Sequence, residues 1–457
     1  MKKRHLLGIL LTLVLMIVSA CNSGESASSD DQGSGDSSST ENQTDSGSGE
    51  TGNKDAEEQE QVEIRFTWWG DTGRNEIYNA IVDRFEEENP NITVKREFGG
   101  WTDYWDKLTT QTAGGNAPDV VSMHQFYVSD YARRGALLPL NDFIDSGIID
   151  TSNTPDSVIN SGKIDDDVFM IAKGITMSGY VYNTAVLDEL GIDYPDLNWT
   201  YEDLEKLSKQ VVEASGGEIY GTSDYAGGQL QPNFRYYLRS LGKDLFTEDG
   251  QLGFESDDLN SWWAMWDSFR QQGLIPDAAT TTEYEGAPLE QNMFVTGKTA
   301  FSQIPANQIT LYQNQFDEGE IQIVRIPTPV GGDSGEFIEG AYLSVTESSE
   351  NPEEAAKFIN FFVNTEKSLE LFKVEQGAPG NTKMSEFIKP LLEAPQVRTV
   401  EFIENTVELA KPAPYSPTGV TELEQVYKDN ASAIAFGQMT VEEAVVDFMD
   451  QAERILK

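Results

Sequence analysis

The order of apolar and polar residues changes its period twice within residues 62–98. Residues 62–68 alternate and are rich in β-branched and aromatic side chains, which predicts a strand. Apolar residues then recur at every fourth position, which predicts a helix; they are Ile77, Ile81 and Phe85. Asp71 or Thr72 can cap this helix, and residues 91–98 alternate again as a second strand.

The same rhythm continues to residue 124. A predicted helix over residues 102–112 ends at Gly114-Gly115, and residues 120–124 predict a buried strand. Alternating strands and helices are typical of an α/β fold with an open, mainly parallel sheet, in which ligands bind beyond the carboxyl ends of the strands. The candidate ligand-binding residues at these ends are Trp69, Asp71, Arg74, Trp101, His124, Gln125 and Tyr127.

Residues 1–20 have the order of a secretory signal peptide. Basic residues precede an apolar run that is too short to span a membrane, and Ser19-Ala20 forms a small-residue cleavage site. Residues 18–21 also resemble the cleavage motif of bacterial lipoproteins, which would leave Cys21 as a lipid-modified N-terminal residue. The alternative is ordinary cleavage that leaves an unmodified thiol.

Residues 21–61 are predicted to form a disordered tether. They are rich in Ser, Gly and acidic residues and hold almost nothing that could enter a core. No later apolar run reaches the length of a membrane span. We therefore expect an extracytoplasmic protein, anchored by lipid to the outer face of a bacterial cell membrane.

The charge and the residue counts narrow the chemistry. The 457 residues include 77 acidic and 32 basic side chains, for a formal net charge of −45. Nucleic-acid binding is excluded, because it needs a basic surface. One cysteine and two histidines leave almost no material for a Ser/His/Asp or Cys/His nucleophile. Because phosphate-loop and His-Glu-x-x-His motifs are also missing from the sequence, we expect a protein that is not an enzyme and needs no cofactor.

Several phrases, in a fixed order, resemble the carbohydrate-type extracellular solute-binding proteins (family 1) of bacterial ABC transporters. They begin with Trp68-Trp69-Gly70-Asp71 and extend to the phrase at 351–362. The phrases between these two lie at residues 85–90, 101–108, 113–120, 179–187, 199–204 and 294–301.

The resemblance implies a two-lobed periplasmic-binding-protein fold (type II), in which each lobe is an open, mainly parallel sheet flanked by helices. The implied lobes are residues 62–176 with 343–393, and residues 177–339 with 397–457. The chain would cross between them three times, near residues 176–179, 339–343 and 393–397. The lobes would close around a sugar or oligosaccharide, with plant-wall and pectin-derived oligosaccharides included, and deliver it to the permease subunits. We expect a monomer.

The resemblance also places residues of the second lobe and of the crossings in the ligand cleft. These residues are Asp224, Tyr225, Phe234, Arg235, Asn307, Glu339, Gly340 and Gln376. Asn307 stands where the family often has a tryptophan, and Gln376 begins a phrase that resembles the family's Gly-x-x-Pro turn.

A sugar offers an apolar C–H face to aromatic rings and a rim of hydroxyls to polar side chains. Trp101 follows Gly99-Gly100, where the backbone can approach a ligand closely, so we expect its ring to stack on the sugar. Trp68 and Trp69 are adjacent on a strand and point to opposite faces, so we expect Trp68 in the core and Trp69 in the cleft.

Other candidates keep a structural alternative. Asp71 can simply cap a helix, and Arg74 can be solvated or neutralise an acidic sugar. His124 and Gln125 can be satisfied interior groups. The aromatic residues Trp262, Trp263 and Trp266 have helical spacing and are predicted to belong to the core.

Two other functions stay open. Glycoside hydrolases use a pair of carboxylates, and a chain with 77 acidic residues could supply such a pair. The first alternative is therefore a surface-anchored glycan-degrading enzyme, which would cleave its ligand. A cell-wall adhesin would bind without lobe closure. The three carboxylates at residues 165–167 are interpreted as a solvated turn, because the spacing of calcium ligands is missing, so we expect no metal.

Overall fold

The computed structural model describes residues 60–227, 233–411 and 416–457. The predicted signal peptide, Cys21 and almost all of the predicted tether lie outside these ranges. Within the ranges, none of the helices combines the length and the apolar character that a membrane span needs.

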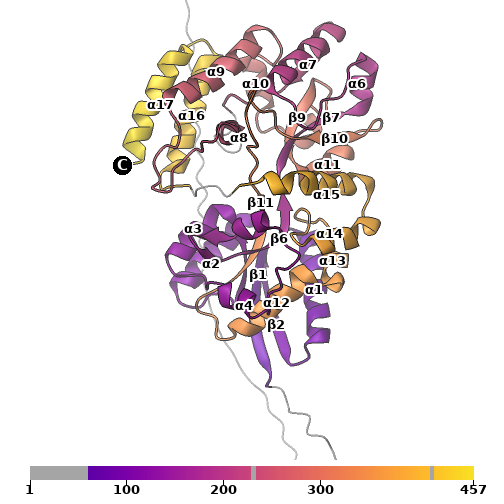
Figure 1. The fold of residues 1–457 in the computed structure, drawn as a ribbon, viewed down its shortest axis with the longest axis vertical. Helices are drawn as coiled ribbons and strands as arrows, with labels where there is room; N and C mark the ends of the chain where they lie inside the picture. Colours follow the sequence, from indigo (N-terminus) through magenta and orange to yellow (C-terminus); the bar gives the residue numbers. More distant parts are fainter. Residues whose placement is uncertain (1–59, 228–232, 412–415) are drawn as a thin grey trace, which may run out of the picture. The chain divides into compact units, whose positions relative to one another are not determined.

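Two larger sheets and one short hairpin hold the strands of the described residues (Figure 1). The strands are β1 (Val62–Trp69), β2 (Ile92–Gly99), β3 (Val120–His124), β4 (Lys163–Ile164), β5 (Asp167–Val168), β6 (Ile171–Thr176), β7 (Ser178–Asn183), β8 (Tyr220–Thr222), β9 (Thr299–Pro305), β10 (Ile321–Val324) and β11 (Glu339–Val345). The first sheet has the order β2-β1-β3-β11-β6, and the second has the order β10-β7-β9-β8.

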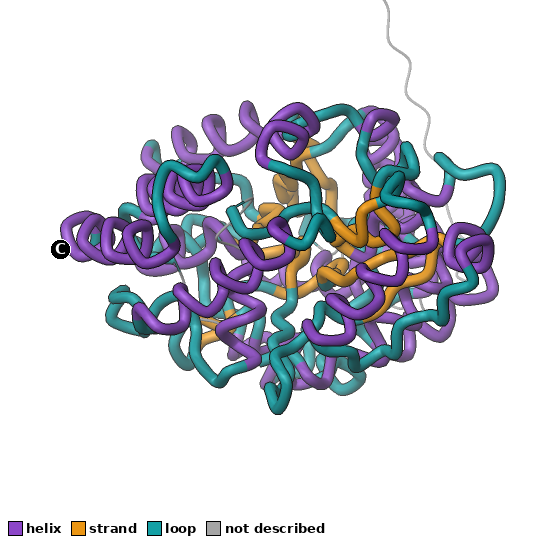
Figure 2. Tube along the Cα trace, turned by 90° about the horizontal axis from the view of Figure 1, so that it is seen from above, coloured by secondary structure: helices purple, strands orange, loops and turns teal. Residues whose placement is uncertain are grey.

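Helices surround the strands, as Figure 2 shows from above. The α-helices are α1 (Thr72–Glu88), α2 (Trp101–Ala113), α3 (Gln125–Arg133), α4 (Asn141–Asp145), α5 (Asp156–Asn160), α6 (Thr184–Leu190), α7 (Tyr201–Ala214), α8 (Arg235–Ser240), α9 (Ser256–Gln271), α10 (Ala278–Tyr284), α11 (Ile309–Gln313), α12 (Pro352–Asn364), α13 (Glu366–Phe372), α14 (Thr382–Ile388), α15 (Ala394–Thr406), α16 (Val420–Ala435) and α17 (Val441–Ile455). Short 3₁₀ turns are η2 (Leu289–Gln291), η3 (Ala306–Gln308), η4 (Lys389–Leu391) and η5 (Val407–Leu409).

The elements predicted for residues 62–124 are confirmed as β1, α1, β2, α2 and β3. The strands β1, β2 and β3 run parallel, so their carboxyl ends meet at one edge of the first sheet. The strand β11 runs antiparallel to β3, with Ala341 opposite His124, so β11 begins at this same edge. The strand β6 ends there, because Thr176 lies opposite Glu339.

The α/β fold class with open, mainly parallel sheets is confirmed, but each of the two larger sheets contains one strand that runs against the others, β11 in the first and β7 in the second. In the first sheet β11 is antiparallel to both of its neighbours, and in the second sheet β7 is antiparallel to both β10 and β9, whereas β8 and β9 are parallel. The reason is the path of the chain between the sheets. It leaves the first sheet along β6 and returns along β11, so these adjacent strands run in opposite directions.

The chain passes directly from β6 into β7, with only Met177 between the two strands. It returns over residues 325–338, between β10 and β11. All of β11 belongs to the first sheet, so this second passage ends before Glu339 rather than within residues 339–343. Further along, α15 packs against α11 and β10, which brings the chain back to the second sheet after η4.

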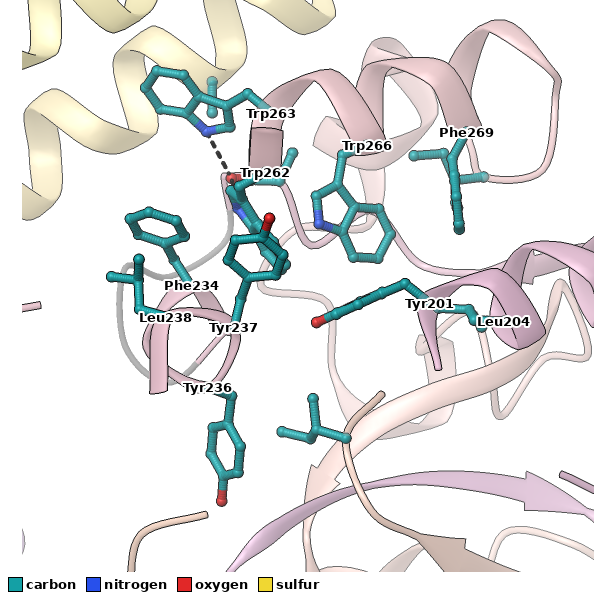
Figure 3. Close-up of a cluster of buried hydrophobic side chains, with 14 of the residues drawn as sticks. Tyr201, Leu204, Phe234, Tyr236, Tyr237, Leu238, Trp262, Trp263, Trp266 and Phe269 are labelled. Carbon is teal, nitrogen blue, oxygen red and sulfur yellow. Dashed lines mark hydrogen bonds between the residues drawn. The ribbon is translucent and has the colours of Figure 1, made fainter. Parts of the chain in front are cut away.

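The core around the second sheet is rich in aromatic side chains (Figure 3). Trp262, Trp263 and Trp266 lie on α9 and are at most 1% exposed, which confirms the prediction that they belong to the core. The indole N–H of Trp262 donates to the Tyr427 hydroxyl at 2.8 Å. Phe234 packs edge-on against Phe254 and is fully buried.

Asp71 caps α1, as one reading of the sequence predicts. Its side chain accepts a hydrogen bond from the backbone N–H of Arg74 at 3.0 Å and is otherwise exposed. Such a cap satisfies one of the N–H groups that a helix leaves unpaired at its start.

We expect Asp71→Ala to lower the free energy of unfolding by about 1 kcal/mol, because the cap is lost. Asp71→Asn keeps an acceptor and should stay within a few tenths of a kcal/mol of the wild type. Urea denaturation measures the free energy of unfolding of both variants. Equal losses in the two variants would assign the effect to the charge instead of the cap.

Candidate functional site

Aromatic rings gather where the parallel strands of the first sheet end. Trp69, the last residue of β1, lies edge-on to Trp101 with ring centroids 5.0 Å apart. Trp101 opens α2 and also lies edge-on to His124, the last residue of β3, at 5.6 Å. Tyr127 on α3 stacks on Trp105 at 3.8 Å with an interplanar angle of 22°. We call Trp69, Trp101, Trp105, His124 and Tyr127 the aromatic edge.

Trp101 is the exposed member of the aromatic edge. Its side chain is 41% exposed, whereas Trp69 and Trp105 are 7% and 6% exposed. The buried rings hold Trp101 in place while leaving part of its surface to solvent. A large aromatic side chain that is fixed by its neighbours and still exposed can accept the apolar face of a ligand.

His124 and Gln125 extend the aromatic edge with polar groups. Burial lowers the pKa of His124 to about 4, so the imidazole is neutral at neutral pH. The Gln125 side chain accepts a hydrogen bond from the backbone N–H of Gly340 at 3.3 Å, which ties α3 to the start of β11.

A polar layer lies beneath Trp69. The Arg74 guanidinium donates to Glu375 at 2.7 Å and to the backbone oxygen of Trp69 at 3.1 Å. Lys173 on β6 lies 5.2 Å from the centre of the Trp69 ring and donates to the Ser122 hydroxyl at 2.7 Å. Burial lowers the pKa of Lys173 well below its usual value.

Gln376 belongs to the same polar layer. Its side-chain oxygen accepts a hydrogen bond from the Tyr78 hydroxyl, and the residue is buried. The following Gly377 has φ +113°, and a Cβ there would approach the backbone oxygen of Ile175 to 2.2 Å. Glycine therefore lets this turn pack against β6. Arg74 and Gln376 lie behind the aromatic edge and support it.

Three hydrogen bonds connect the two residues that flank the β6–β7 passage to Glu339 and Asn307. The Ser178 hydroxyl at the start of β7 donates to Glu339 at the start of β11, at 3.0 Å. The Thr176 hydroxyl at the end of β6 donates to the Asn307 side chain at 3.3 Å and accepts from the Asn307 backbone N–H at 3.2 Å. Asn307 is exposed, and Glu339 and Asn307 thus each bond a residue that flanks Met177, where the chain passes from the first sheet to the second.

Burial raises the pKa of Glu339 to about 7, against the opposing effects of the Ser178 hydrogen bond and the Arg235 charge. An unfolded chain has the ordinary value of 4.5. Between these two values the folded state binds the extra proton, so the contribution of Glu339 to stability falls as the pH rises from about 4.5 to about 7.

We therefore expect Glu339→Gln to stabilise the protein at pH 8 by about 1–2 kcal/mol and to have little effect near pH 4.5. The measurement is the melting temperature of both proteins across this pH range. A difference that does not change with pH would show that Glu339 titrates with an ordinary pKa.

The predicted residues of the second lobe do not gather in one place. Arg235 on α8 donates to Asp244 at 2.8 Å and lies 5.2 Å from the centre of the Phe337 ring. Its positive charge acts to lower the pKa of Glu339. The Tyr225 hydroxyl accepts from the backbone N–H of Gln303 at 2.6 Å.

Two of the predicted ligand contacts, Asp224 and Phe234, lie away from the aromatic edge. Asp224 pairs with Arg270 at 2.5 Å and lines a separate cavity at the side of the second sheet. Phe234 is 0% exposed within the aromatic core, so no surface is left for a ligand. In both cases the sequence did not determine which way the side chain points, because the loop cannot be aligned residue by residue with the family's phrases.

Some residues of the site were missed by the sequence reasoning. Lys173, Ser178 and Glu375 all contact predicted residues. Lys173 had a usable signal, because it is the lone charged residue in the apolar run at 168–176. Ser178 and Glu375 carried none, since their partners are distant in the sequence.

No set of three or more His, Cys, Asp or Glu side chains suited to a metal ion occurs among the described residues. In the segment 165–167, Asp165 has a positive φ of 55° and faces Arg133 at 3.5 Å. This is the geometry of a turn.

Comparison with known proteins identifies the family. The profile of the bacterial extracellular solute-binding proteins matches residues 80–399. A solved structure of an extracellular solute-binding protein family 1 from Alicyclobacillus acidocaldarius is 25% identical, covers 88% of this chain and 100% of its own, and superposes with a TM-score of 0.77.

Two further proteins are similar along most of the chain. The structure of a periplasmic oligogalacturonide binding protein from Yersinia enterocolitica is 22% identical over 86% of this chain and 99% of its own, with a TM-score of 0.74. A maltooligosaccharide ABC transporter solute-binding lipoprotein of Streptococcus pneumoniae is 24% identical over 75% of this chain and 78% of its own. The fold is thus that of the two-domain periplasmic binding proteins, and the chain belongs to the bacterial extracellular solute-binding protein family.

Proposed function

We propose that this protein is the lipid-anchored receptor of an ABC importer, that it captures a sugar or oligosaccharide between two lobes, and that it delivers the ligand to the permease. Cys21 would carry the lipid. The lobes would follow the bounds expected from the sequence, except that β11 as a whole goes with the first: residues 62–176 with 339–393, and residues 177–324 with 397–457.

The observation that carries the proposal is the exposure of Trp101 at the end of the first sheet. A pyranose ring can pack its C–H face on the exposed indole, at about 25 cal/mol per Å² of apolar area removed from water. The backbone and side chains of His124, Gln125 and Glu339 lie at the same edge and can bond the hydroxyl rim. Each such hydrogen bond adds about 1 kcal/mol net.

The relatives supply the ligand class. The Streptococcus protein is named for maltooligosaccharide, and the Yersinia protein is named for oligogalacturonide. We extend only the shared feature, an oligosaccharide, to this chain. A plant-wall ligand, pectin-derived oligosaccharides included, is the finer form of the proposal.

Closure of the lobes would report loading to the permease. A ligand stabilises the closed state only through contacts that it gains there, with both lobes at once. The hydrogen bonds Ser178–Glu339 and Thr176–Asn307 lie where the chain bends in such a motion.

The test is the melting temperature of residues 22–457 with a panel of neutral and acidic oligosaccharides, followed by analysis of each sugar for cleavage. A ligand at 100 times its Kd should stabilise the protein by about 2.7 kcal/mol. A shift with intact sugar supports the proposal. A shift with cleavage would replace the receptor by an enzyme, and the absence of any shift across the panel would refute sugar binding.

A further inference from the structure

A separate cavity lies beside the β8 edge of the second sheet. Its volume is about 490 Å³, within the roughly 300–1,000 Å³ of typical small-molecule sites. Its wall comes from the residues after β8, the end of α9, α10, the segment before β9, and α16. No residue of the aromatic edge lines it, nor does Glu339.

Two buried polar groups in this wall lack a hydrogen-bond partner among the described residues. They are Nε of Arg270 and the hydroxyl of Thr281. The Arg270 side chain is only 10% exposed. Nearly all buried polar groups in folded proteins are paired, so an unpaired donor and an unpaired hydroxyl in one cavity point to a partner that enters from solvent.

The remainder of Arg270 is held rigidly. One Nη donates to Asp224 at 2.5 Å and the other donates to Asp267 at 3.0 Å. Asp224 in turn accepts from the backbone N–H of Ala226 at 2.9 Å. The guanidinium is therefore oriented before any ligand arrives, and its Nε–H is among the donors left to bind one.

The charges of the wall select against ions. Asp224, Glu285 and Asp429 oppose Arg270 and Lys428, which leaves a net negative wall. An anion would meet this charge and would find both Nη atoms of Arg270 already bound to carboxylates. A cationic group such as an ammonium has no lone pair that could accept from the unpaired Nε–H of Arg270. A neutral molecule is free of both penalties.

The remaining wall suits hydroxyl groups and a C–H face. Thr282 and Asn292 add polar side chains, and Phe436 adds an aromatic ring that is 49% exposed. Donors and acceptors beside an exposed ring are the features that bind sugars and polyols.

We propose that this cavity is a second binding site, which takes a neutral polyhydroxylated molecule of about the size of a monosaccharide. The site is independent of the aromatic edge and of the proposed function, so each can fail without the other.

The test uses saturation-transfer NMR of the mature chain with D-glucose, D-galactose, myo-inositol and glycerol, and with D-galacturonate as the anionic comparison. Thr281→Val removes the unpaired hydroxyl at nearly constant volume. Ala435→Trp places a large ring at the cavity wall, and Ala279→Trp, on an exposed position of α10 outside the cavity, is its matched control.

We expect at least one neutral probe to bind, with Kd raised tenfold or more in Thr281→Val and in Ala435→Trp. Ala279→Trp and Trp101→Ala should leave that Kd unchanged. Binding that is lost in Trp101→Ala but survives Ala435→Trp would place the probe at the aromatic edge and overturn the proposal. Lack of binding by every neutral probe, or a preference for galacturonate, would overturn it as well.

Discussion

Trp101→Ala is expected to weaken binding of the transported oligosaccharide by about 1–3 kcal/mol, which is roughly a 5- to 150-fold rise in Kd. The indole is 41% exposed, and the edge contacts of Trp69 and His124 hold it in one orientation. A ligand that stacks on it therefore loses little additional side-chain entropy, and the alanine variant forfeits almost all of the stacking. Isothermal titration calorimetry with the sugar that raises the melting temperature measures this loss.

Phe98→Ala is the matched control for Trp101→Ala. Phe98 is 49% exposed and lies only three residues away, but its ring contacts Trp68 on the opposite face of the first sheet. It should leave the ligand affinity unchanged, and Trp101→Phe should recover part of it. Equal effects of Trp101→Ala and Phe98→Ala would exclude Trp101 from the ligand contacts.

The elements around the first sheet could be predicted because their signals are local. The alternation in β1, the four-residue period in α1 and the apolar run of β3 each depend on adjacent residues. The opposite directions of Trp68 and Trp69 followed from the same alternation. Trp68 contacts Tyr78 on α1, and Trp69 contacts Tyr104 on α2.

The strand directions and the partners of polar side chains could not be predicted, because they do not depend on neighbouring residues in the sequence. Periodicity is the same for a parallel and an antiparallel strand, so β11 gave no sign that it runs against β3. Arg74 meets Glu375 across 301 positions of the chain, and Ser178 meets Glu339 across 161. Such pairs are set by the tertiary fold, and single-residue patterns do not contain them.

The ligand contacts predicted for the second lobe show the same limit. Asp224 and Phe234 lie close in the sequence to Tyr225 and Arg235, and all four resembled ligand contacts. The structure instead buries Phe234 against Phe254 and pairs Asp224 with Arg270. Family phrases locate a loop, but the direction of each side chain depends on the helices that pack around it.

A buried ion pair in the second passage should contribute more to stability than the Asp71 cap or the Glu339 carboxyl. Glu336 is 2% exposed, and both of its oxygens accept from the Arg325 guanidinium, one of them at 2.7 Å. Arg325 also donates to Asn198 at 2.6 Å, and Ser334 donates to Glu336. These bonds fix residues 325–338, the segment that connects β10 to β11 and positions Glu339.

We expect Glu336→Ala to lower the free energy of unfolding by about 3–5 kcal/mol, because it leaves the buried Arg325 charge without its partner. Replacing both residues by leucine removes the charge with the partner, so the double variant should lose less than Glu336→Ala. Urea denaturation of the two variants decides this. If the double variant is less stable than the wild type, the attraction between the charges exceeds their desolvation cost. If the double variant is more stable than the wild type, the pair serves chiefly to orient the passage. The ligand affinity of the double variant should then fall although its fold persists.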